Sequence, residues 1–223
     1  MHNKHPLLLV YNEFLKLDNG IEEELNVIIY HTLAVIAFII FISIWLSLDT
    51  DFIHKLDAWG ERTFGGNSFL EFFHYLGEIW FVVLVGVVLV VYFIVKKRYR
   101  NMTFVLFTFV GGTVVNQSIK FIVERPRPLI PDQLTSYSFP SGHSMLSMLY
   151  MMTAAFLITS NMTKTKKRIA FIIAGLGTFL VGLSRVAGSR HFMSDVLGGW
   201  TLGFAFFMLV IYWYMRTKKE NSL

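Results

Sequence analysis

The chain has 223 residues, of which 54% are hydrophobic and only 16% are charged, and its formal net charge is +5. An ordinary soluble domain carries about 25% charged residues, so this composition argues against one and favours a chain whose apolar surface faces lipid. The absence of cysteine excludes disulfides and thiolate metal sites. The basic residues lie in short clusters between apolar runs, which favours a membrane protein over a nucleic-acid-binding one.

The first segment, residues 1–25, is of mixed polarity and contains the acidic run IEEEL. It therefore does not have the basic start and early apolar core of a cleavable signal peptide. The apolar stretch 26–48 that follows is long enough to span a bilayer and has no small-residue cleavage site. We expect it to be a retained membrane anchor.

Six apolar stretches have about the length that a transmembrane helix needs. Because backbone groups in lipid must be hydrogen-bonded within their own segment, we expect each stretch to be an α-helix. The predicted spans cover about 26–48, 77–95, 102–123, 144–160, 169–186 and 196–215. The amphipathic stretch 49–76 is expected to form one or two interfacial helices, with Trp59 at the depth of the headgroups. The predicted fold class is an all-α polytopic membrane protein with a single domain over 1–223.

Three basic clusters set the predicted orientation. KKRYR, KTKKR and RTKK hold eleven of the twenty Lys and Arg residues, and they follow the second, fourth and sixth spans. They therefore lie on one side of the membrane, which the positive-inside rule makes cytoplasmic. Both termini are then cytoplasmic by parity, while the acidic stretch 49–76 lies outside. The connections 124–143 and 185–195 share that outer side.

The two outer connections contain more basic than acidic residues, so their expected guest is an anion with several oxygens. The residues of interest are Lys120, Arg125, Arg127, Ser141, Gly142, His143, Arg185, Arg190, His191 and Asp195. Four of the five prolines lie in 126–140 and take the chain out of helix. The sequence FPSGH then combines a serine that can cap a helix, a glycine that lets backbone approach a ligand, and the free N–H groups of a helix start. This combination predicts an anion cradle.

His191 and Asp195 are four residues apart, so they share a face if the sixth helix begins there. A carboxylate bound to one imidazole nitrogen fixes the tautomer and makes the other nitrogen more basic, as a nucleophile or a base requires. His143 has no such partner nearby in sequence and is better suited to donating a proton. The expected reaction class is phosphoryl transfer through a covalent intermediate, without a metal ion.

Three motifs stand in order along this part of the chain. KFIVERPRP has lysine, six residues and Arg-Pro; PSGH follows; and SRVAGSRHFMSD has Ser-Arg, five residues, His, three residues and Asp. Together they resemble the signature of the type-2 phosphatidic acid phosphatase superfamily, which also includes vanadium haloperoxidases and bacterial acid phosphatases. The motifs cover about 120–195, and the matching topology covers about 26–215.

The resemblance implies that the chain is a membrane phosphatase domain with a histidine nucleophile. In that family pattern His191 forms a phosphohistidine, Asp195 orients it and His143 protonates the leaving oxygen. The residues that would hold the phosphate oxygens are Lys120, Arg127, Ser141, the Gly142 amide and Arg185.

The chain departs from the family pattern just before the motif histidine. Many membrane members have Tyr-Leu-Gly-Val there, whereas this chain has Ala187, Gly188, Ser189 and Arg190. The essential residue types and spacing are intact, so activity is expected. Arg190 is a candidate contact for a second phosphate or an anionic headgroup, with an orientation toward solvent as the alternative.

The leading interpretation is an integral membrane phosphatase that acts on a lipid phosphate or diphosphate at the outer face. Bacterial members that resemble this chain process phosphatidylglycerophosphate and undecaprenyl diphosphate, and phosphatidic acid is a third option. The basic loops fit a bacterial plasma membrane. We expect no cofactor, metal ion or nucleic acid; the expected partners are the lipid substrate and the surrounding membrane lipids.

Two other classes of function remain as alternatives: a transporter or channel, and a lipid-binding protein with an inactive phosphatase-like site. Charged residues of transporters tend to lie near the bilayer midplane, whereas here they lie at the ends of spans. The complete set of His143, His191 and Asp195 argues against an inactive site.

Several polar residues outside the motifs have structural interpretations. The acidic residues of the interfacial segment are expected to lie along an exposed helix face rather than to bind a metal ion; they are Asp49, Asp51, Asp57 and Glu61. Glu124 and Arg125 are expected to pair with neighbours or face water. His31, inside the first span, is expected to make a helix–helix contact.

Overall fold

The structure is a computed structural model that describes the backbone of residues 6–220 and the side chains from Glu24 to Thr217 except Asn26. The described part is helical and contains no strand, which confirms the all-α class. The elements are α1 (Pro6–Leu46), α2 (Asp51–Phe64), α3 (Ser68–Glu71), the 3₁₀ helix η1 (Phe72–Gly77), α4 (Ile79–Val95), α5 (Tyr99–Leu106), the π-helical η2 (Phe107–Gly111), α6 (Gly112–Val123), α7 (Gly142–Ile158), α8 (Lys164–Ala187) and α9 (Met193–Glu220).

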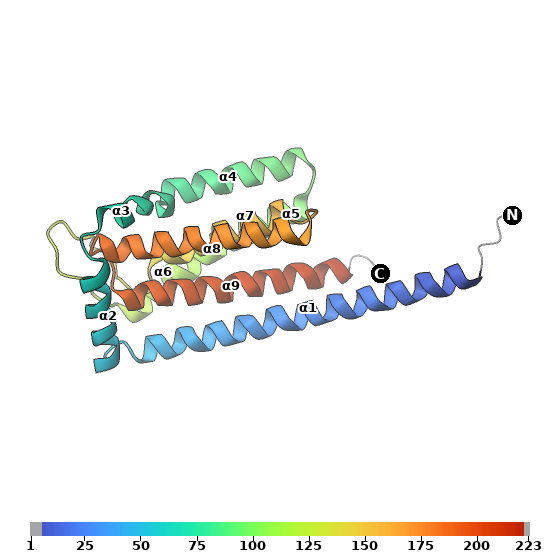
Figure 1. Ribbon diagram of the computed structural model, residues 1–223. Coiled ribbons are helices and arrows are strands. Elements are labelled where there is room, and N and C mark those ends of the chain that lie inside the picture. The colour runs from blue at the N-terminus through green and yellow to red at the C-terminus, as the bar shows by residue number, and fades with distance from the viewer. Residues whose placement is uncertain (1–5, 221–223) are drawn as a thin grey trace.

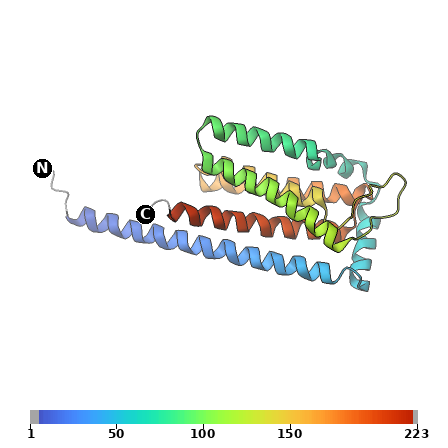
Figure 2. The same ribbon diagram turned by 180° about the vertical axis from the view of Figure 1, so that it is seen from behind.

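The long helices form a bundle in which α1 lies beside α9 and extends beyond it at the N-terminal end (Figures 1 and 2). The contact between α1 and α9 includes the predicted one of His31, whose ring lies 5.4 Å from that of Tyr212. Phe41 of α1 is fully buried and stacks on Phe139 of the connection between α6 and α7, with ring centroids 5.6 Å apart. Helix α1 thereby supports the loop that carries part of the candidate site.

Four helical stretches are long and apolar enough to cross a membrane: Val27–Leu46, Tyr99–Val123, Lys164–Ala187 and Met193–Thr217. A fifth results if Ser68–Gly77 and Ile79–Val95, which meet at a bend of 44°, form one span. Helix α7 has 17 residues, which is about 25 Å at the α-helical rise and less than a hydrocarbon core of about 30 Å. The helices thus lie where the sequence predicts them, but their lengths alone do not establish six spans.

Large apolar side chains are exposed around the outside of the bundle. Ile39 of α1, Val88 of α4 and Ile173 of α8 are 57%, 58% and 64% exposed. Soluble monomers rarely expose a contiguous apolar surface of such extent. Together with the apolar helices, this surface identifies the chain as a membrane protein.

The segment 49–76 is helical, as predicted, and α2 lies across one end of the bundle (Figure 1). Thr50 caps α2, because its hydroxyl accepts a hydrogen bond from the N–H of Ile53 at 3.5 Å. The expectation that Asp57 is exposed is wrong: this side chain is only 7% exposed and points at the start of α9. Its burial follows from the position of α2, whose inner face packs on the bundle.

The packing of α7 against α9 brings the ends of two motifs together. Gly199 and Gly203 of α9 form a small-xxx-small pair that faces α7, and this spacing permits close approach of helices in a membrane. A Cβ on Gly199 would lie 2.6 Å from the carbonyl oxygen of Ser141. On the other side of the same residue, the N–H of Ser141 donates to the carbonyl of Asp195 at 2.9 Å. Helix α9 thus holds the start of α7 directly.

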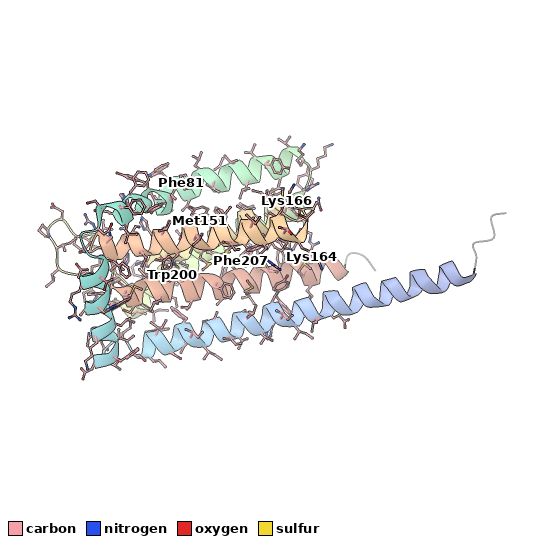
Figure 3. The ribbon with its side chains drawn as sticks, in the orientation of Figure 1. Phe81, Met151, Lys164, Lys166, Trp200 and Phe207 are labelled. Atoms are coloured by element: carbon pink, nitrogen blue, oxygen red, sulfur yellow. The ribbon has the colours of Figure 1, made fainter. Side chains whose placement is uncertain are left out.

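The two ends of the bundle differ in their chemistry. The three basic clusters lie at the end opposite α2, where Figure 3 shows Lys164 and Lys166. The connections 124–141 and 188–192 lie at the end that α2 covers (Figure 1). The motif residues therefore gather at one end, and the basic clusters at the other.

Candidate active site

His191 occupies the short connection between α8 and α9, two residues before α9 begins. The sixth helix therefore does not begin at His191, which was the condition under which the sequence put His191 and Asp195 on one helix face. The predicted contact with Asp195 is nevertheless present, because Nδ1 of His191 lies 3.2 Å from Oδ2 of Asp195. The imidazole is 2% exposed and the carboxylate is fully buried.

The second nitrogen of the ring has a different partner. Nη1 of Arg127 lies 3.0 Å from Nε2 of His191. A guanidinium can only donate hydrogen bonds, so Nε2 is the acceptor and the ring proton is on Nδ1. The Nδ1–H group therefore donates a hydrogen bond to the carboxylate of Asp195. This hydrogen-bond network assigns the tautomer. It leaves the lone pair of Nε2 directed at the cation.

The imidazole of His191 is kept neutral by its surroundings. Burial lowers the pKa of His191 well below its usual value, and the positive charges of Arg127, Lys120 and Arg185 lower it further. Both effects disfavour the protonated ring. A neutral imidazole with an unprotonated Nε2 has the form that a nucleophile requires, once the hydrogen bond from Arg127 to this nitrogen is exchanged for a substrate contact.

The three basic residues that are predicted to hold the phosphate, Lys120, Arg127 and Arg185, differ in the hydrogen bonds that their side chains make. Lys120, at the end of α6, donates from Nζ to the carbonyls of Tyr137 at 2.5 Å and Ser138 at 3.1 Å. The side chain of Arg185, near the end of α8, has no hydrogen bond within the described part of the chain, and its Nε is buried without a partner. An unpaired buried guanidinium is costly, so an anion is its expected partner.

Arg127 is bound on all its N–H groups. Nε donates to the carbonyl of Ser136 at 2.7 Å, and Nη1 donates to the carbonyl of Arg190 at 2.8 Å as well as to His191. Nη2 donates to the hydroxyl of Ser136 at 3.0 Å and to the carbonyl of Tyr137 at 3.4 Å. These bonds tie the connection 124–141 to the connection that carries the histidine.

The predicted anion cradle lies at a helix start, as the sequence indicates. Ser141 is the N-cap of α7, and its hydroxyl accepts from the N–H of Ser144 at 3.4 Å. Gly142 is the first residue of the helix, and a Cβ there would lie 3.2 Å from Oδ1 of the buried Asn116. Helix starts carry N–H groups with no partner inside the helix and favour anions.

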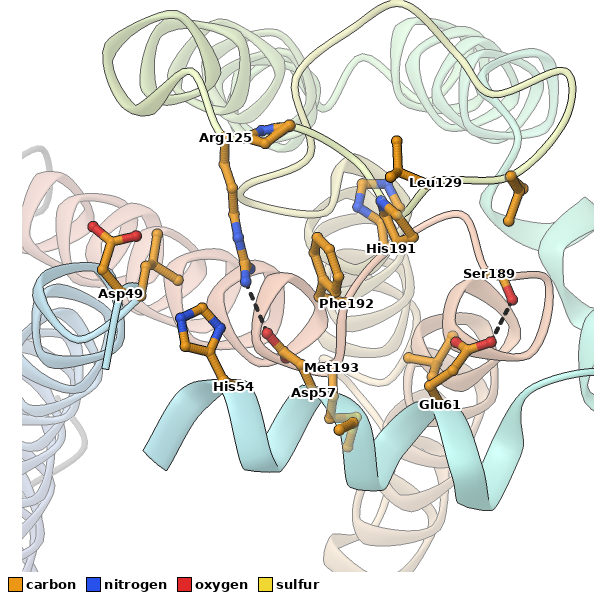
Figure 4. Close-up of a pocket in the computed structure, with 16 residues that line it drawn as sticks. Asp49, His54, Asp57, Glu61, Arg125, Leu129, Ser189, His191, Phe192 and Met193 are labelled. Carbon is orange, nitrogen blue, oxygen red and sulfur yellow. Dashed lines mark hydrogen bonds and ion pairs between the residues drawn. The ribbon is translucent and has the colours of Figure 1, made fainter. Parts of the chain in front are cut away.

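A cavity of about 530 Å³ lies between α2 and the two connections, and the imidazole of His191 is part of its wall (Figure 4). Asp57 and Glu61 of α2 line the opposite side. The cavity lies beside His191, but the other predicted catalytic and phosphate-binding residues do not line it; they are Lys120, Arg127, Ser141, Gly142, His143, Arg185 and Asp195.

Residues 101–219 match the model of the PAP2 superfamily. The chain belongs to the PAP2 superfamily. The match contains all three motifs, so the family predicted from the signature residues is confirmed.

Individual relatives share parts of their length with this chain. Phosphatidylglycerophosphatase B from Bacillus subtilis (strain 168) is 38% identical over 122 residues, which are 53% of this chain and 60% of that protein. An undecaprenyl-diphosphatase from Sulfolobus acidocaldarius is 29% identical over 119 residues, which are 49% of this chain and 54% of that protein. The chain thus spans less than two thirds of the length of these curated relatives.

A solved structure extends the likeness to most of the fold. The crystal structure of a transmembrane PAP2-type phosphatidylglycerolphosphate phosphatase from Bacillus subtilis superposes with a TM-score of 0.70 and is 27% identical in sequence. The alignment covers 84% of this chain and 96% of that one.

His143, the histidine of the PSGH motif, has a partner that lies far from it in the sequence. Nε2 of His143 lies 3.2 Å from Oε1 of Glu78, the residue that precedes α4. The His143 side chain is 20% exposed and that of Glu78 is 32% exposed. As expected, His143 has no partner among its sequence neighbours; its partner in the fold, Glu78, is 65 residues away in the chain.

Arg125, two residues before the PAP2 motif arginine, is neither solvent-exposed nor paired with a sequence neighbour. Its Nη2 lies 2.8 Å from Oδ2 of Asp57 (Figure 4), and its Nη1 lies 2.6 Å from Oδ1 of Asp195. Arg190, by contrast, donates from Nη1 to the carbonyl of Asp132 at 2.8 Å. The side chain of Arg190 thus contacts the connection 124–141, and only its carbonyl contacts Arg127.

Proposed function

We propose that this PAP2 chain is an integral membrane lipid phosphatase that hydrolyses a phosphate monoester or diphosphate through a phosphohistidine intermediate, without a metal ion. The observation that carries the proposal is the His191 ring, held by Asp195 on one nitrogen and facing Arg127 with the other. A phosphate oxygen that replaces this contact with Arg127 brings the phosphorus within reach of Nε2.

In the first chemical step, Nε2 of His191 attacks phosphorus and the bond from phosphorus to the bridging oxygen breaks. The leaving oxygen takes a proton from His143, so that a lipid alcohol, or a lipid monophosphate from a diphosphate, departs. Asp195 stabilises the positive charge that develops on the histidine ring. The charge of the transferring phosphoryl group is balanced by Lys120, Arg127 and Arg185.

In the second step, a water molecule attacks the phosphohistidine. His143, neutral after the first step, takes a proton from this water, in accordance with microscopic reversibility. The bond between phosphorus and Nε2 breaks, its electron pair returns to the nitrogen, and inorganic phosphate is released.

The proposal includes six spans, with α7 as the fourth, and an interfacial position for α2, α3 and η1. The positive-inside rule then assigns the basic clusters and both termini to the cytoplasm and the motifs to the outer face of a bacterial plasma membrane. The separation of the basic clusters from the motif connections at opposite ends of the bundle supports this orientation.

The proposed substrates are phosphatidylglycerophosphate and undecaprenyl diphosphate. The support comes from two relatives, one named phosphatidylglycerophosphatase B and one named undecaprenyl-diphosphatase. A lipid tail would remain among the exposed apolar helices while the phosphate reaches the outer end of the bundle. The position of the charged residues at this end argues against the alternative of a transporter, whose charges lie near the midplane.

Phosphate release by detergent-purified protein tests the proposal. The panel contains phosphatidylglycerophosphate, undecaprenyl diphosphate and phosphatidic acid, each with EDTA and with vanadate. Activity that survives EDTA and is blocked by vanadate supports a histidine mechanism, whereas activity abolished by EDTA and restored by Mg²⁺ refutes it. His191→Ala is expected to remove turnover, and His31→Ala, whose ring lies against Tyr212, is the matched control.

A further inference from the structure

We propose that Asp57 and Arg125 are a positioning pair that holds Asp195, and through Asp195 the ring of His191. Arg125 is one of the six unspecified residues of the first motif, and Asp57 comes from α2, outside the stretch 101–219 that matches the family. The inference rests on the proposed function. It makes α2 a part of the catalytic assembly rather than only a surface helix.

The first step of the argument is the full burial of Asp195. Its Oδ2 accepts from Nδ1 of His191 and from the N–H of Phe192 at 3.0 Å. Its Oδ1 lies 2.6 Å from Nη1 of Arg125 and also accepts from the Ser138 hydroxyl at 3.4 Å. A buried carboxylate is stable only when it is paired and hydrogen-bonded. Arg125 is the permanent cation bound to this carboxylate.

The second step concerns what holds Arg125. Its guanidinium is planar and presents a fixed fork of donors. One arm binds Asp195 and the hydroxyl of Ser194 at 2.8 Å, and the other binds Asp57 at 2.8 Å. The guanidinium also lies over the ring of Phe192, 4.4 Å from its centroid. The side chain is only 12% exposed, so its orientation is fixed on several sides.

The third step is the attachment of Asp57 to the helix that carries Asp195. Oδ1 of Asp57 accepts from the N–H of Ser194 at 2.8 Å, and Oδ2 accepts from the Ser194 hydroxyl at 2.9 Å. A carboxylate at this place also interacts favourably with the dipole of α9. Close contact is possible because Gly60 faces Met193: a Cβ on Gly60 would lie 2.7 Å from Cβ of Met193.

These contacts form a continuous chain from α2 to the nucleophile: Asp57, Arg125, Asp195 and His191. Both terminal nitrogens of Arg125 donate to side chains, those of Asp57, Asp195 and Ser194. Arg125 shares none of the backbone carbonyls to which Arg127 donates. Loss of the pair is therefore expected to disturb the orientation of the imidazole more than the binding of phosphate.

The test compares Asp57→Asn with Asp51→Asn, an equal loss of charge at an exposed position in the same helix. We expect Asp57→Asn to lower kcat by about 10- to 100-fold, by analogy with the loss of groups that orient metal-binding histidines. KM and the inhibition constant of inorganic phosphate should remain unchanged. Asp51→Asn should match the wild type. Equal kcat values for the two variants overturn the proposal, as does a parallel loss of phosphate binding.

A second set of variants distinguishes positioning from general damage to the fold. Arg125→Met should lower kcat more than Arg125→Lys, which retains the charge but not the fork. Because Asp57 acts partly through Arg125 and partly through Ser194, the double variant Asp57→Asn/Arg125→Met should lose less kcat than the product of the two single losses. Additive losses would show that the two side chains act separately and would contradict the inference.

Thermal melting separates this inference from the proposed function. If the wild type released phosphate from none of the lipids, the proposed lipid phosphatase would fail. Coupling between Asp57 and Arg125 would still be measurable, because the losses of melting temperature in the two single variants and the double variant must be non-additive if the pair exists. Additive losses refute the pair.

Discussion

Replacement of Gly199 by alanine tests whether the contact between α7 and α9 aligns the two histidines. A Cβ at this position would lie 2.6 Å from the carbonyl oxygen of Ser141 and 2.8 Å from Cβ of Ser144. Both atoms belong to the start of α7, where Ser141 is the N-cap and part of the candidate phosphate cradle. A methyl group on Gly199 must therefore push the start of α7 away from α9.

The size of the displacement follows from these distances. A carbon and a carbonyl oxygen in contact are about 3.3 Å apart, so the start of α7 has to move by about 0.7 Å. Overpacking of this kind costs about 1–3 kcal/mol, partly offset by about 1 kcal/mol from the better helix propensity of alanine. A misplacement near 1 Å can cost about 100-fold in rate. We therefore expect kcat to fall by more than about tenfold, with a lower melting temperature.

The assay is phosphate release from the lipid panel, with melting in the same detergent. Gly175→Ala is the matched control, because this glycine also lies in a long helix but its Cβ would meet only the end of the Met152 side chain, at 3.9 Å. The control should have unchanged activity and an equal or higher melting temperature. Full activity of Gly199→Ala, or equal losses in the two variants, would refute the role of close α7–α9 contact in the alignment.

Three further predictions concern the ionisable groups. Glu78 contacts His143, the proposed proton donor, so Glu78→Gln should slow hydrolysis of lipid substrates. Hydrolysis of p-nitrophenyl phosphate should slow less, because its good leaving group does not need a proton. Equal slowing of the two substrates would contradict the role of His143 as proton donor. Arg185→Met should weaken inhibition by inorganic phosphate by about tenfold or more, the value of a hydrogen bond to a charged group, while Arg62→Met on the exposed face of α2 should not. Because the pKa of His191 is lowered in the folded protein, the folded state binds fewer protons than the unfolded one, so the melting temperature should fall as the pH drops below about 6.5. His191→Gln should make this fall shallower, and an unchanged slope would show that His191 is not the group responsible.

The sequence predicts those parts of the site whose members lie close together along the chain. His191 and Asp195 are four residues apart, and Pro140 to His143 form one turn, so motif spacing identifies them. Asp57 cannot be found in this way, because its partner Ser194 lies 137 residues later. Acidic residues on an amphipathic helix are usually solvated, and only the packing of α2 across the bundle reveals that this one is buried.

The ends and interruptions of the helices are predicted from the sequence only where a local signal marks them. Hydropathy finds the apolar part of α1 near residue 26, but the helix itself begins at Pro6, because a helix can continue beyond the stretch that lipid covers. The interruption of the third span by η2 has no proline and was not predicted. Glu78 was not assigned a role, since its contact with His143 depends on the bend between η1 and α4.

The bonds of Arg127 have a consequence for how tightly the site retains its product. A guanidinium has five N–H donors, and those of Arg127 have five acceptors inside the protein: two on Ser136 and one each on Tyr137, Arg190 and His191. On the proposed mechanism, an incoming phosphate would therefore exchange hydrogen bonds with this arginine instead of adding them. The exchange moderates ground-state affinity, since the net gain of a swapped hydrogen bond is small.

The same exchange assists release. When inorganic phosphate leaves, the acceptors on the two connections can take back the donors of Arg127, so the departure does not leave this guanidinium without hydrogen bonds. A cation reserved for the anion alone would bind both substrate and product more tightly and slow each cycle. The self-bonded arginine favours rapid clearance of the product over strong retention of it.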